Sequence, residues 1–502
     1  MDILASLGHG MLVALEPINL LYVLVGVFLG TAVGILPGIG PSLTIALLLP
    51  ITAGVNPSAV FMMFAGIYYG AQYGGSTTTI LINTPGEATS VVTALEGYQM
   101  ARRGRAGAAL ATAAIGSFVA GNIAAVAMMF FSPILVKFAL RFGPAEYFAL
   151  MVLAVTTITG LLGEQVLKGL ASLFIGLALG LVGMDLQTGQ ARFTFGFSEL
   201  LDGIDVVIIA VGLFGVGEML WMASRSSEEL EEKAVLDGPV GMTREEWSRS
   251  WLPWLRGSGL GFAVGSLPAG GGEIPTFLSY AIERKLSRRP EEWGKGAIEG
   301  VAGPEAANNA AAGGSLMPLL TLGIPTSATA AIMLAAFNQY GLQPGPLLFI
   351  NSADLVWGLI ASLYIGNVML LVLNLPMIPL WVRVLDIPKP QLYAAILIFA
   401  TLGAWSLNGS YFDLGIIFLV GCLSFAFRCF SIPLGPLILG FILGPRLEQE
   451  FRRALAVSAG DYLTFFERPI SLTIFIVAAL VVAAPFAYRL WNTRRMRTAL
   501  LS

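Results

Sequence analysis

The sequence predicts an all-α integral membrane protein of about ten to twelve transmembrane helices, in two inverted-topology repeats that contain helix breaks or re-entrant hairpins. Three observations predict this fold. Of the 502 residues, 56% are hydrophobic and only 12% are charged, with a mean hydropathy of +0.79, so the apolar surface exceeds what a soluble core could bury. Long apolar runs recur along the chain, and one glycine-rich motif occurs twice with opposite loop charge.

The apolar runs are expected to be helices. A segment that crosses hydrocarbon must satisfy its own backbone hydrogen bonds, and these runs lack the alternation of a barrel strand. The clearest runs, each suited to about 30 Å of hydrocarbon, are Leu20 to Leu36, Ala145 to Leu162, Leu167 to Met184, Val206 to Trp221, Leu355 to Leu375 and Ile470 to Tyr488. The first residues, Met1 to Leu15, lack the charged start and cleavage site of a signal peptide, so we expect them to be retained.

Charge and cysteine content exclude some classes of protein. The formal net charge is −3 and the Lys and Arg residues are scattered among loops, so no basic stripe could follow a phosphate backbone. This excludes nucleic acid as a partner. The two cysteines, Cys422 and Cys429, lie in one apolar run about two helical turns apart, so no structural disulfide is expected.

A long motif occurs twice. The segment from Gly30 to Gly40, GTAVGILPGIG, aligns with the segment from Gly261 to Gly271, GFAVGSLPAGG, and seven of eleven positions are identical. Further matches follow at an offset that drifts to about 240: Gly74-Gly75-Ser76 with Gly313-Gly314-Ser315, and the segment from Pro85 to Thr89 with that from Pro325 to Thr329. The two halves are therefore copies of one unit.

Loop charges predict the relative orientation of the copies, because positive residues stay on the cytoplasmic side of short loops. In the first half the late loop is basic and the early loop, 53–58, has no positive charge; in the second half the early loop is basic and the late loop, 338–345, is uncharged. The basic residues are Arg102, Arg103 and Arg105 in the first half and Arg284, Lys285, Arg288 and Arg289 in the second. The reversed bias predicts inverted repeats, an architecture typical of secondary transporters.

These patterns divide the chain into four predicted segments. Residues 1–223 and 257–490 are the two membrane repeats, 224–256 is a polar cytoplasmic connector, and 491–502 is a basic cytoplasmic tail. The connector carries Trp247, Trp251 and Trp254, which suits an interfacial helix. If connector and tail are both inside, the N-terminus is outside and each Leu-Pro segment is a re-entrant hairpin, although Leu20 to Leu36 is long enough to span by itself.

The paired helix breaks are the candidate binding site. Gly and Pro interrupt apolar segments at matched positions in both halves, and non-helical backbone in a membrane must be buried or line a cavity. Half-helices that start at such breaks aim their N-terminal amides at anions, while hydroxyls and freed carbonyls can serve an anion or Na⁺. The candidate substrate-binding residues are Gly38, Gly40, Ser42, Asn83, Thr84, Pro85, Gly86, Gly323, Pro325, Thr326 and Ser327.

These residues also have purely structural interpretations. The glycines and prolines could be ordinary kinks and close helix contacts. The hydroxyls of Thr77, Thr78 and Thr79 are expected to bond back to their own helix. No Arg falls at a break, so an anionic substrate would be held mainly by dipoles and hydroxyls.

Acidic residues at membrane depth are functional candidates because they are costly to place there. Glu87, Glu273 and Glu305 qualify, and Glu305 has Asn308 and Asn309 one helical turn later. The candidate cation-binding residues are Glu305, Asn308, Asn309, Gly271 and Glu273, with no other metal expected. In the alternative, Glu305 lies in the first turn of a helix that starts at Pro304 and only favours the helix dipole. Expected loop or helix-end acids are Glu164, Asp185, Glu218, Asp354 and Asp413.

Six motifs carry a family resemblance. They are Gly34-Ile-Leu-Pro-Gly-Ile-Gly-Pro41, Tyr68-Tyr-Gly-Ala-Gln-Tyr-Gly-Gly75, Asn83-Thr-Pro-Gly-Glu-Ala88, Leu95-Glu-Gly-Tyr-Gln-Met-Ala-Arg102, Pro304-Glu-Ala-Ala-Asn-Asn-Ala310 and Leu320-Thr-Leu-Gly-Ile-Pro325. Over nearly the whole chain, the sequence resembles the large membrane subunit, of TctA type, of the tripartite tricarboxylate transporter family. An arginine that a family member could carry after Gly74 and Gly75 is replaced by Ser76.

The resemblance implies a multi-pass protein of the bacterial cytoplasmic (inner) membrane. It would be the transport-conducting subunit of a secondary carrier that imports citrate or other small carboxylates by alternating, elevator-like access. Its partners would be a small membrane subunit of TctB type and a periplasmic solute-binding protein of TctC type. The coupling ion would be Na⁺, with H⁺ as the alternative, and no other cofactor is implied.

Two other classes of membrane protein are the alternatives. A membrane-embedded enzyme lacks parts, since His9 is the only histidine and no convergent catalytic groups are evident, so the chain is expected not to be an enzyme. A stand-alone channel or an ATP-driven permease for small anions is the second alternative. The chain has no Gly-x-x-x-x-Gly-Lys-Ser/Thr loop, so a permease would need a separate ATPase.

Overall fold

The computed structural model describes residues 3–36, 39–84, 86–161, 166–185, 187–224, 240–267, 271–384 and 389–483. Two compact units are distinguished. Unit 1 comprises Met1–Ala139, Val206–Leu267 and Gly271–Ala426, and unit 2 is built mainly from Leu140–Asp205 and Phe427–Ser502. Both copies of the repeated motif therefore lie in one compact unit rather than in two.

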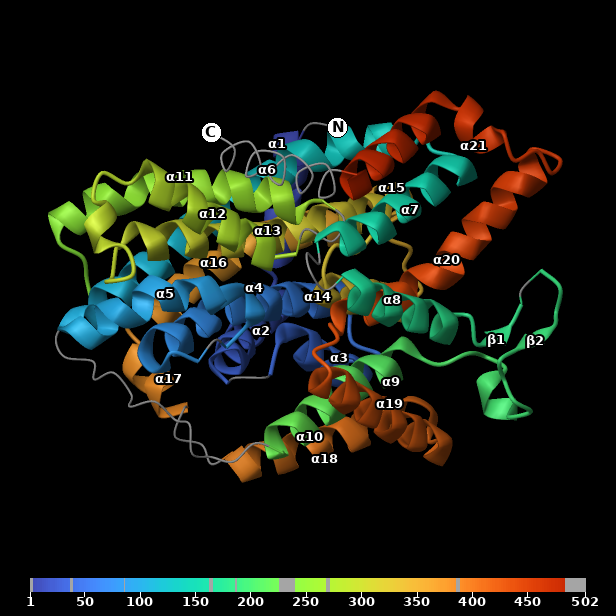
Figure 1. The fold of residues 1–502 in the computed structure, drawn as a ribbon, viewed down its shortest axis with the longest axis horizontal. Coiled ribbons are helices and arrows are strands. Elements are labelled where there is room, and N and C mark those ends of the chain that lie inside the picture. The colour runs from blue at the N-terminus through green and yellow to red at the C-terminus, as the bar shows by residue number, and fades with distance from the viewer. Residues whose placement is uncertain are drawn as a thin grey trace, which may run out of the picture. The chain divides into compact units, whose positions relative to one another are not determined.

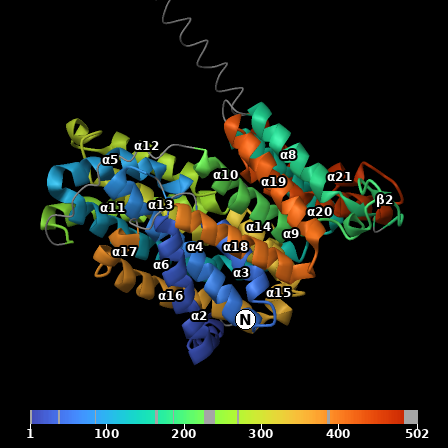
Figure 2. The ribbon, with the colours of Figure 1, turned by 90° about the horizontal axis from the view of Figure 1, so that it is seen from below.

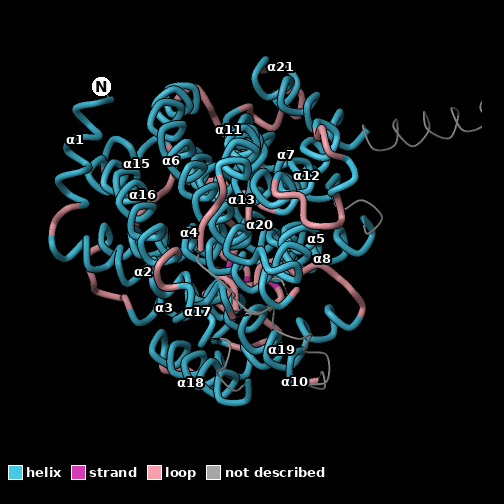
Figure 3. The backbone as a smooth tube through the Cα atoms, turned by 90° about the vertical axis from the view of Figure 1, so that its left-hand side faces the viewer, coloured by secondary structure: helices cyan, strands magenta, loops and turns pink. Residues whose placement is uncertain are grey.

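Helices form nearly all the regular structure of the described residues (Figure 3). The strands in these residues, β1 (Gly183–Met184) and β2 (Ala191–Arg192), pair antiparallel in unit 2. The predicted all-α fold class is confirmed.

Six helices of the described residues are long and apolar enough to cross a membrane: Pro17–Ile35, Ala88–Ala139, Val206–Ala223, Ala353–Asn374, Pro390–Asn408 and Tyr411–Cys429. Shorter apolar helices are Ile3–Ala14, Pro41–Ile51, Pro144–Thr157, Val166–Gly180 and Pro469–Ala483. Long apolar helices thus fall short of the expected ten to twelve crossings. Part of the reason is that two long helices, Pro57–Ile82 and Glu299–Leu322, are almost wholly buried and rich in Gly and polar residues, so they need no apolar face toward lipid.

The first copy follows the short helix α1 (Ile3–Ala14). It consists of α2 (Pro17–Ile35), α3 (Pro41–Ile51), α4 (Pro57–Ile82), η1 (Ala88–Ser90), α5 (Val91–Met100), η2 (Ala101–Arg105) and α6 (Ala106–Ala139), drawn from blue to cyan in Figure 1. Proline opens α2, α3 and α4, where its missing N–H costs no helical hydrogen bond.

The second copy consists of α11 (Arg244–Gly265), α12 (Glu273–Leu286), η7 (Pro290–Glu292), α13 (Glu299–Leu322), α14 (Ala328–Gln339), α15 (Pro346–Asn351) and α16 (Ala353–Asn374). A capping box fixes the start of α11, because Thr243 and Glu246 each bond the other's backbone N–H. The remaining helices of unit 1 are α9 (Val206–Ala210), η5 (Val211–Val216), α10 (Gly217–Ala223), α17 (Ile378–Val384), α18 (Lys389–Asn408) and α19 (Tyr411–Cys429). Helix α18 runs alongside α3 (Figure 2).

Glycines let α2 and α4 pack backbone to backbone. A Cβ added to Gly30 would lie 2.5 Å from the carbonyl oxygen of Ile67, and one added to Gly34 would lie 2.3 Å from that of Ala71. No side chain fits at these distances, so glycine is required at both positions.

The second copy repeats this contact. A Cβ on Gly261 would lie 2.2 Å from the carbonyl oxygen of Ala307, and one on Gly265 would lie 2.6 Å from the Cα of Ala311. These positions follow the first-copy contacts at constant offsets of 231 in α11 and 240 in α13. The two copies therefore share a packing interface as well as a sequence motif.

The same geometry corrects the alignment of the second motif by one residue. A Cβ on Gly74 would lie 2.2 Å from the carbonyl oxygen of Thr31, and one on Gly314 would lie 2.5 Å from that of Phe262. Gly74 is thus equivalent to Gly314, not to Gly313 as the sequence match predicts. A run of small residues in both helices makes the register ambiguous in sequence, and the backbone contact removes the ambiguity.

The equivalent helices α4 and α13 run in opposite directions. Ser76 donates a hydrogen bond to Glu305, while Tyr69, two turns earlier in α4, has its hydroxyl 2.4 Å from where a Cβ of Gly313 would stand, two turns later in α13. Each copy also lends its long final helix to the other: α6 packs against α11 and α13, and α16 packs against α2 and α4.

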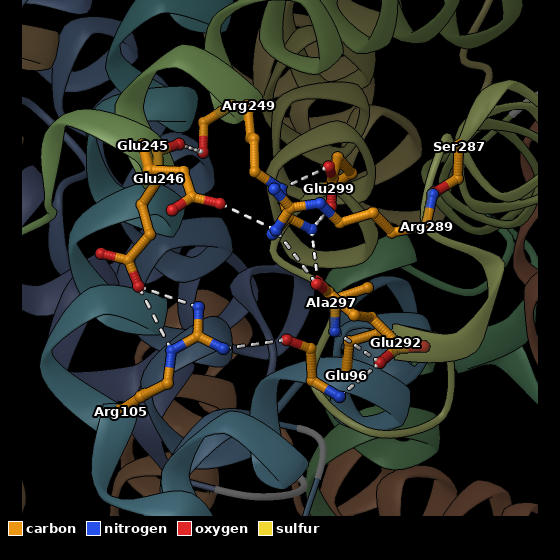
Figure 4. A network of polar contacts seen from close by, with 12 residues as sticks. Glu96, Arg105, Glu245, Glu246, Arg249, Ser287, Arg289, Glu292, Ala297 and Glu299 are labelled. Atoms are coloured by element: carbon orange, nitrogen blue, oxygen red, sulfur yellow. Dashed lines mark hydrogen bonds and ion pairs between the residues drawn. The ribbon is translucent and has the colours of Figure 1, made fainter.

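Both basic loops meet at the start of α11. Arg105, the last residue of η2, pairs with Glu246 at 2.8 Å, and Arg289, after α12, pairs with the neighbouring Glu245 at 2.8 Å (Figure 4). The late loop of the first copy and the early loop of the second are therefore neighbours.

The loops without positive charge also meet. Tyr340, at the end of α14, donates a hydrogen bond of 2.6 Å to the carbonyl of Thr52, at the end of α3. The early loop of the first copy, 53–58, thus adjoins the late loop of the second, 338–345. The basic loops and the uncharged loops form two separate pairs, each with one member from each copy.

The expected connector boundary at residue 256 falls inside a helix. Helix α11 runs from Arg244 to Gly265, so residues 244–256 belong to the first helix of the second copy. Trp247 and Trp251 are about half exposed on it, as an interfacial position requires, whereas Trp254 is buried and donates to the carbonyl of Thr112. The connector residues 225–239 and the tail 491–502 lie outside the described residues.

Unit 2 consists of α7 (Pro144–Leu161), α8 (Val166–Gly180), β1, β2, η4 (Ser198–Leu200), α20 (Gly435–Val457), α21 (Thr464–Glu467) and the helix Pro469–Ala483. Gly176 of α8 touches the backbone of Leu437, which brings α8 against α20. Near β1, Asp185 pairs with Arg452 at 2.9 Å. Cys422 and Cys429, both on α19, are free.

Candidate functional site

All four expected breaks separate helices in the described residues. The first lies between α2 and α3, the second between α4 and η1, the third between α11 and α12, and the fourth between α13 and α14. The described candidates at these breaks are Gly40, Ser42, Asn83, Thr84, Gly86, Gly271, Glu273, Gly323, Pro325, Thr326 and Ser327. Gly38 and Pro85 were also expected here, as were the breaks at Pro37 and Pro268, and these four residues lie outside the described residues.

The second and fourth breaks have the same backbone form. Helix α4 ends at Asn83 with φ 53°, and α13 ends at Gly323 with φ 69°, both in the left-handed conformation that closes helices. Four residues later, Glu87 and Ser327 stand in extended backbone at the start of the next helix. The two breaks are thus equivalent at an offset of 240.

Thr326 of the second copy is equivalent in position to Gly86 of the first. A Cβ on Gly86 would lie 2.1 Å from the carbonyl oxygen of Gly34. At the equivalent place, Thr326 donates a hydrogen bond of 3.0 Å to the carbonyl of Gly265 and contacts the hydroxyl of Ser315 at 2.7 Å. Thr326 therefore satisfies a carbonyl that helix α11 leaves unpaired at its end.

The break after α13 also contacts the first copy. Ser327 caps α14 by accepting from the N–H of Ala330 at 3.2 Å, and its hydroxyl lies 3.1 Å from that of Tyr68 in α4. Tyr68 is buried. This hydrogen bond joins the candidate site of one copy to the core helix of the other.

At the breaks, the helix that starts in one copy packs against an element of the other copy. Helix α3 of the first copy packs on α14 of the second, and α12 of the second packs on η1 of the first. The carboxylate of Glu87 lies beside Gly40, at the start of α3, and the amide of Asn308 lies beside Gly272, at the start of α12. Each of these helix N-termini therefore faces a polar side chain rather than lipid.

Glu305 is the centre of a buried polar cluster. Its carboxylate accepts hydrogen bonds from the hydroxyls of Ser76 in α4 and Thr93 in α5, one on each oxygen, and the residue is fully buried. The helix-start reading of Glu305 is wrong, because α13 begins at Glu299 and Pro304 lies inside the helix. We call Ser76, Thr93, Ser117, Glu305, Asn308 and Asn309 the polar cluster.

The two asparagines extend the polar cluster in different directions. Asn309 donates 2.6 Å to the hydroxyl of Ser117 in α6. The amide of Asn308 is buried and has no hydrogen-bond partner among the described residues. Gly271 and Glu273, the other candidates for the cation site, flank Gly272 at the start of α12, which lies beside the Asn308 amide, and Glu273 is exposed.

A pocket lies beside the polar cluster. It is lined by Tyr73, Ser76, Thr77, Leu110, Ala113, Ala114, Ser117, Asn374 and Ile378. We expected a cavity lined by the second and fourth breaks, and this pocket includes neither. At those two breaks, Gly86 and Thr326 sit directly against helix-end carbonyls.

Sequence reasoning missed the hydroxyls that hold Glu305. Ser76 attracted notice only as a departure from a family pattern, and Thr93 and Ser117 carry no local signal in their helices. The expectation for the threonine run is met by Thr79, which donates 2.8 Å to the carbonyl of Gly75. The hydroxyl of Thr78 donates 3.2 Å to the carbonyl of Ile35 in α2 and contacts that of Gly74, in its own helix, at 3.5 Å.

The remaining acids divide as expected, with one exception. Asp185 lies in a loop, Asp354 begins α16, and Asp413 begins α19. Glu218 is buried in the last two turns of the helical segment Val206–Ala223, rather than in a loop or at a helix end. Glu164 lies outside the described residues.

The chain matches the family described as "Tripartite tricarboxylate transporter TctA family" over residues 20–439. A protein of Agrobacterium vitis, described as an uncharacterized 52.8 kDa protein in the TAR-I ttuC′ 3′ region, is 49% identical over 486 residues, which cover 96% of each chain. A second protein of that organism, described as an uncharacterized protein in the TAR-II ttuC′ 3′ region, is 47% identical over 214 residues, 43% of this chain and 88% of the other. No solved structure matches the chain.

The family match covers most of the described helices, both copies of the motif and all four breaks. The apolar helices make the chain a multi-pass membrane protein, and the family is one of transporters rather than enzymes. The chain therefore belongs to the TctA family of tripartite tricarboxylate transporters.

Proposed function

We propose that the chain is the transport-conducting subunit of a binding-protein-dependent secondary carrier in the bacterial inner membrane. The carrier imports tricarboxylates or related small carboxylates, driven by a gradient of Na⁺ or, alternatively, H⁺. Its partners are a small membrane subunit of TctB type and a periplasmic binding protein of TctC type. The observation that carries the proposal is the pair of matched breaks around a buried carboxylate, Glu305.

Inverted repeats and alternating access are part of the proposal. The opposite directions of α4 and α13, the exchange of α6 and α16 between the copies, and the separate pairing of basic and uncharged loops all support it. In an inverted arrangement, equivalent elements lie on opposite sides of the membrane, so a small rearrangement can exchange the accessible side.

The substrate carboxylates bind at the breaks. Helix N-termini offer backbone N–H groups and a favourable dipole to an anion. Ser42 near the start of α3 and Ser327 at the start of α14 add hydroxyl donors at two such ends. Tyr68 holds Ser327 at the packed break, and movement of α14 relative to α4 would release this hydroxyl.

The coupling cation binds at the polar cluster. Glu305 supplies a carboxylate, and Ser76 and Thr93 supply hydroxyl oxygens on the same side. Oxygen ligands of this type suit a hard cation such as Na⁺, and a buried carboxylate without a cationic partner is costly. A bound proton would meet the same need, which is why H⁺ remains the alternative.

Uptake into proteoliposomes tests the proposal. The chain and its small membrane subunit are reconstituted, the binding protein is added outside, and a panel of radiolabelled mono-, di- and tricarboxylates is offered under imposed Na⁺ or pH gradients. The expected result is accumulation that needs the binding protein and one inward cation gradient. Equal flux without either, or flux driven only by ATP, would contradict it.

A further inference from the structure

Glu96 of α5 is a fully buried carboxylate held by backbone amides. It accepts hydrogen bonds from the N–H groups of Gly294 at 2.6 Å, Gly296 at 2.8 Å and Ala297 at 2.9 Å, and from the hydroxyl of Tyr280 at 2.9 Å. No Lys or Arg side chain donates to it in the hydrogen bonds of the described residues. Four donors that converge on one carboxylate form an anion site, here filled by the chain itself.

The loop that supplies these amides is shaped for an anion. Gly294 and Gly296 have φ of 75° and 100°, which turn successive N–H groups toward one point. The N–H of Ala297 belongs to the approach to α13, which begins at Glu299, so the positive end of that helix dipole also points to the carboxylate. We call residues 293–298, with the hydroxyl of Tyr280, the amide nest.

Ion pairs brace the amide nest from outside. Arg249 binds Glu299 through two hydrogen bonds of 2.8 Å and Glu292 at 2.6 Å, on either side of the loop (Figure 4). Arg105 donates 3.3 Å to the carbonyl of Gly296. None of these contacts involves Glu96, so the amide nest keeps its shape without that carboxylate.

Helix α5 connects the amide nest with the polar cluster. Thr93, which holds Glu305, is one helical turn before Glu96. A displacement of α5 that follows from cation binding at Glu305 would move Glu96 out of the amide nest. The side chains of Arg105 and Arg289 flank this side of unit 1, and each is paired with a glutamate at the start of α11.

We propose that the amide nest is a carboxylate-binding site on the basic side of the protein, which Glu96 closes in this conformation and a substrate carboxylate occupies when α5 withdraws. The inference rests on the proposed function for its substrate class. Glu96 then acts as an internal competitor: it occupies the site at high effective concentration and is exchanged for one carboxyl group of the departing substrate.

Acetate tests the site without any transport. Glu96→Ala leaves the four donors facing a space the size of a carboxylate, so acetate should raise the Tm of the purified full chain saturably, by about 2–4 °C near saturation. Acetamide, of the same size but neutral, should give no shift. If Glu96→Ala does not fold, Glu96→Ser, whose short side chain also leaves that space empty, should show the same preference for acetate.

Tyr280→Phe is the matched control. It removes one donor but leaves Glu96 in the amide nest, so acetate should not change its Tm. An acetate effect on Tyr280→Phe as large as that on Glu96→Ala, or none on either Glu96 variant, would overturn the site.

Counterflow then tests the exchange. Because Glu96 no longer competes, the half-saturating substrate concentration at the basic side should fall about tenfold or more in Glu96→Ala, and that at the other side should stay unchanged. Acetate binding with unchanged half-saturation on the basic side would make the amide nest a structural latch and overturn the exchange. Failure of the wild type to carry any carboxylate would refute the proposed function alone, since the acetate result does not depend on transport.

Discussion

Ser76 and Glu305 join two helices that occupy equivalent places in the two copies and run in opposite directions. The serine hydroxyl of α4 donates to the carboxylate of α13, with both residues buried. This bond connects the internal repeat, the buried charge and the candidate cation site.

Because α11 and α13 are in backbone contact, the effect of a glycine-to-alanine substitution on the Tm should depend strongly on which glycine of α11 is replaced. Gly261→Ala should lower the Tm markedly, since its Cβ would lie 2.2 Å from the carbonyl of Ala307, and overpacking of this kind costs about 1–3 kcal/mol. Thermal unfolding of the purified protein measures it. Gly259→Ala, two residues away with nothing within 4 Å, is the control and should match wild type. Equal loss in both variants would contradict the close packing.

The second and fourth breaks predict unequal responses to alanine. Gly86→Ala places a Cβ 2.1 Å from the carbonyl of Gly34 and should distort the break, abolishing uptake and lowering the Tm. Thr326→Ala removes only a hydroxyl and leaves the carbonyl of Gly265 unpaired, which costs about 1–3 kcal/mol. Gly86→Ala should therefore lose more uptake and have a lower Tm than Thr326→Ala. The reverse order would show that the breaks are not equivalent.

Loop pairing predicts which residues react from which side. In a Cys422→Ser, Cys429→Ser background, Arg103→Cys and Arg288→Cys should be labelled by an impermeant maleimide only from the cytoplasm, because both basic loops meet at α11. Ser58→Cys and Gln343→Cys should be labelled only from outside. Labelling of Arg103→Cys and Ser58→Cys from the same side would rule out the inverted arrangement.

Asp185 in unit 2 predicts an acid-dependent loss of stability. A hydrogen bond from the backbone N–H of Gln187 and the pair with Arg452 hold the pKa of this carboxyl well below its usual 3.8. A lowered pKa in the folded state contributes stability above 3.8, and this contribution is lost as the pH falls through the lowered pKa.

The Tm of wild type should therefore exceed that of Asp185→Asn at pH 7, and the gap should close as the pH falls below about 4. Asp461→Asn, at an exposed turn of the same unit, serves as the control. A gap that is constant from pH 7 to pH 3 would mean that the ionised form of Asp185 contributes nothing.

The helical class, the internal repeat and the four breaks could be predicted from sequence because each has a one-dimensional signature. Apolar runs report lipid contact, and proline with glycine reports a helix end. The exact alignment of α4 with α13 could not be predicted, because Gly313 and Gly314 are neighbouring glycines and only the contact with the carbonyl of Phe262 distinguishes them. The connector was expected to extend to residue 256 because the first turns of α11 are polar and tryptophan-rich, although they are part of that helix.

Of the candidate site, Glu305 could be predicted from sequence, but its hydrogen-bond partners could not. Glu305 stood out as a carboxylate in an apolar segment, which composition alone reveals. Its hydroxyl partners Ser76 and Thr93 are 229 and 212 residues away in sequence, and nothing local marks them. Glu96 was overlooked because its partners are mainly backbone amides, which no sequence pattern displays.

Cation coupling through Glu305 is the central claim, and one comparison tests it most directly. Na⁺-driven uptake is measured in proteoliposomes with Glu305→Gln, which keeps the shape but removes the charge, and with Glu199→Gln, an exposed residue of η4 outside the polar cluster. We predict that Glu305→Gln folds and docks the binding protein but raises the half-saturating Na⁺ concentration about tenfold or more, or loses Na⁺ dependence, while Glu199→Gln keeps wild-type Na⁺ dependence. Unchanged Na⁺ dependence and affinity in a folded Glu305→Gln protein would contradict the account.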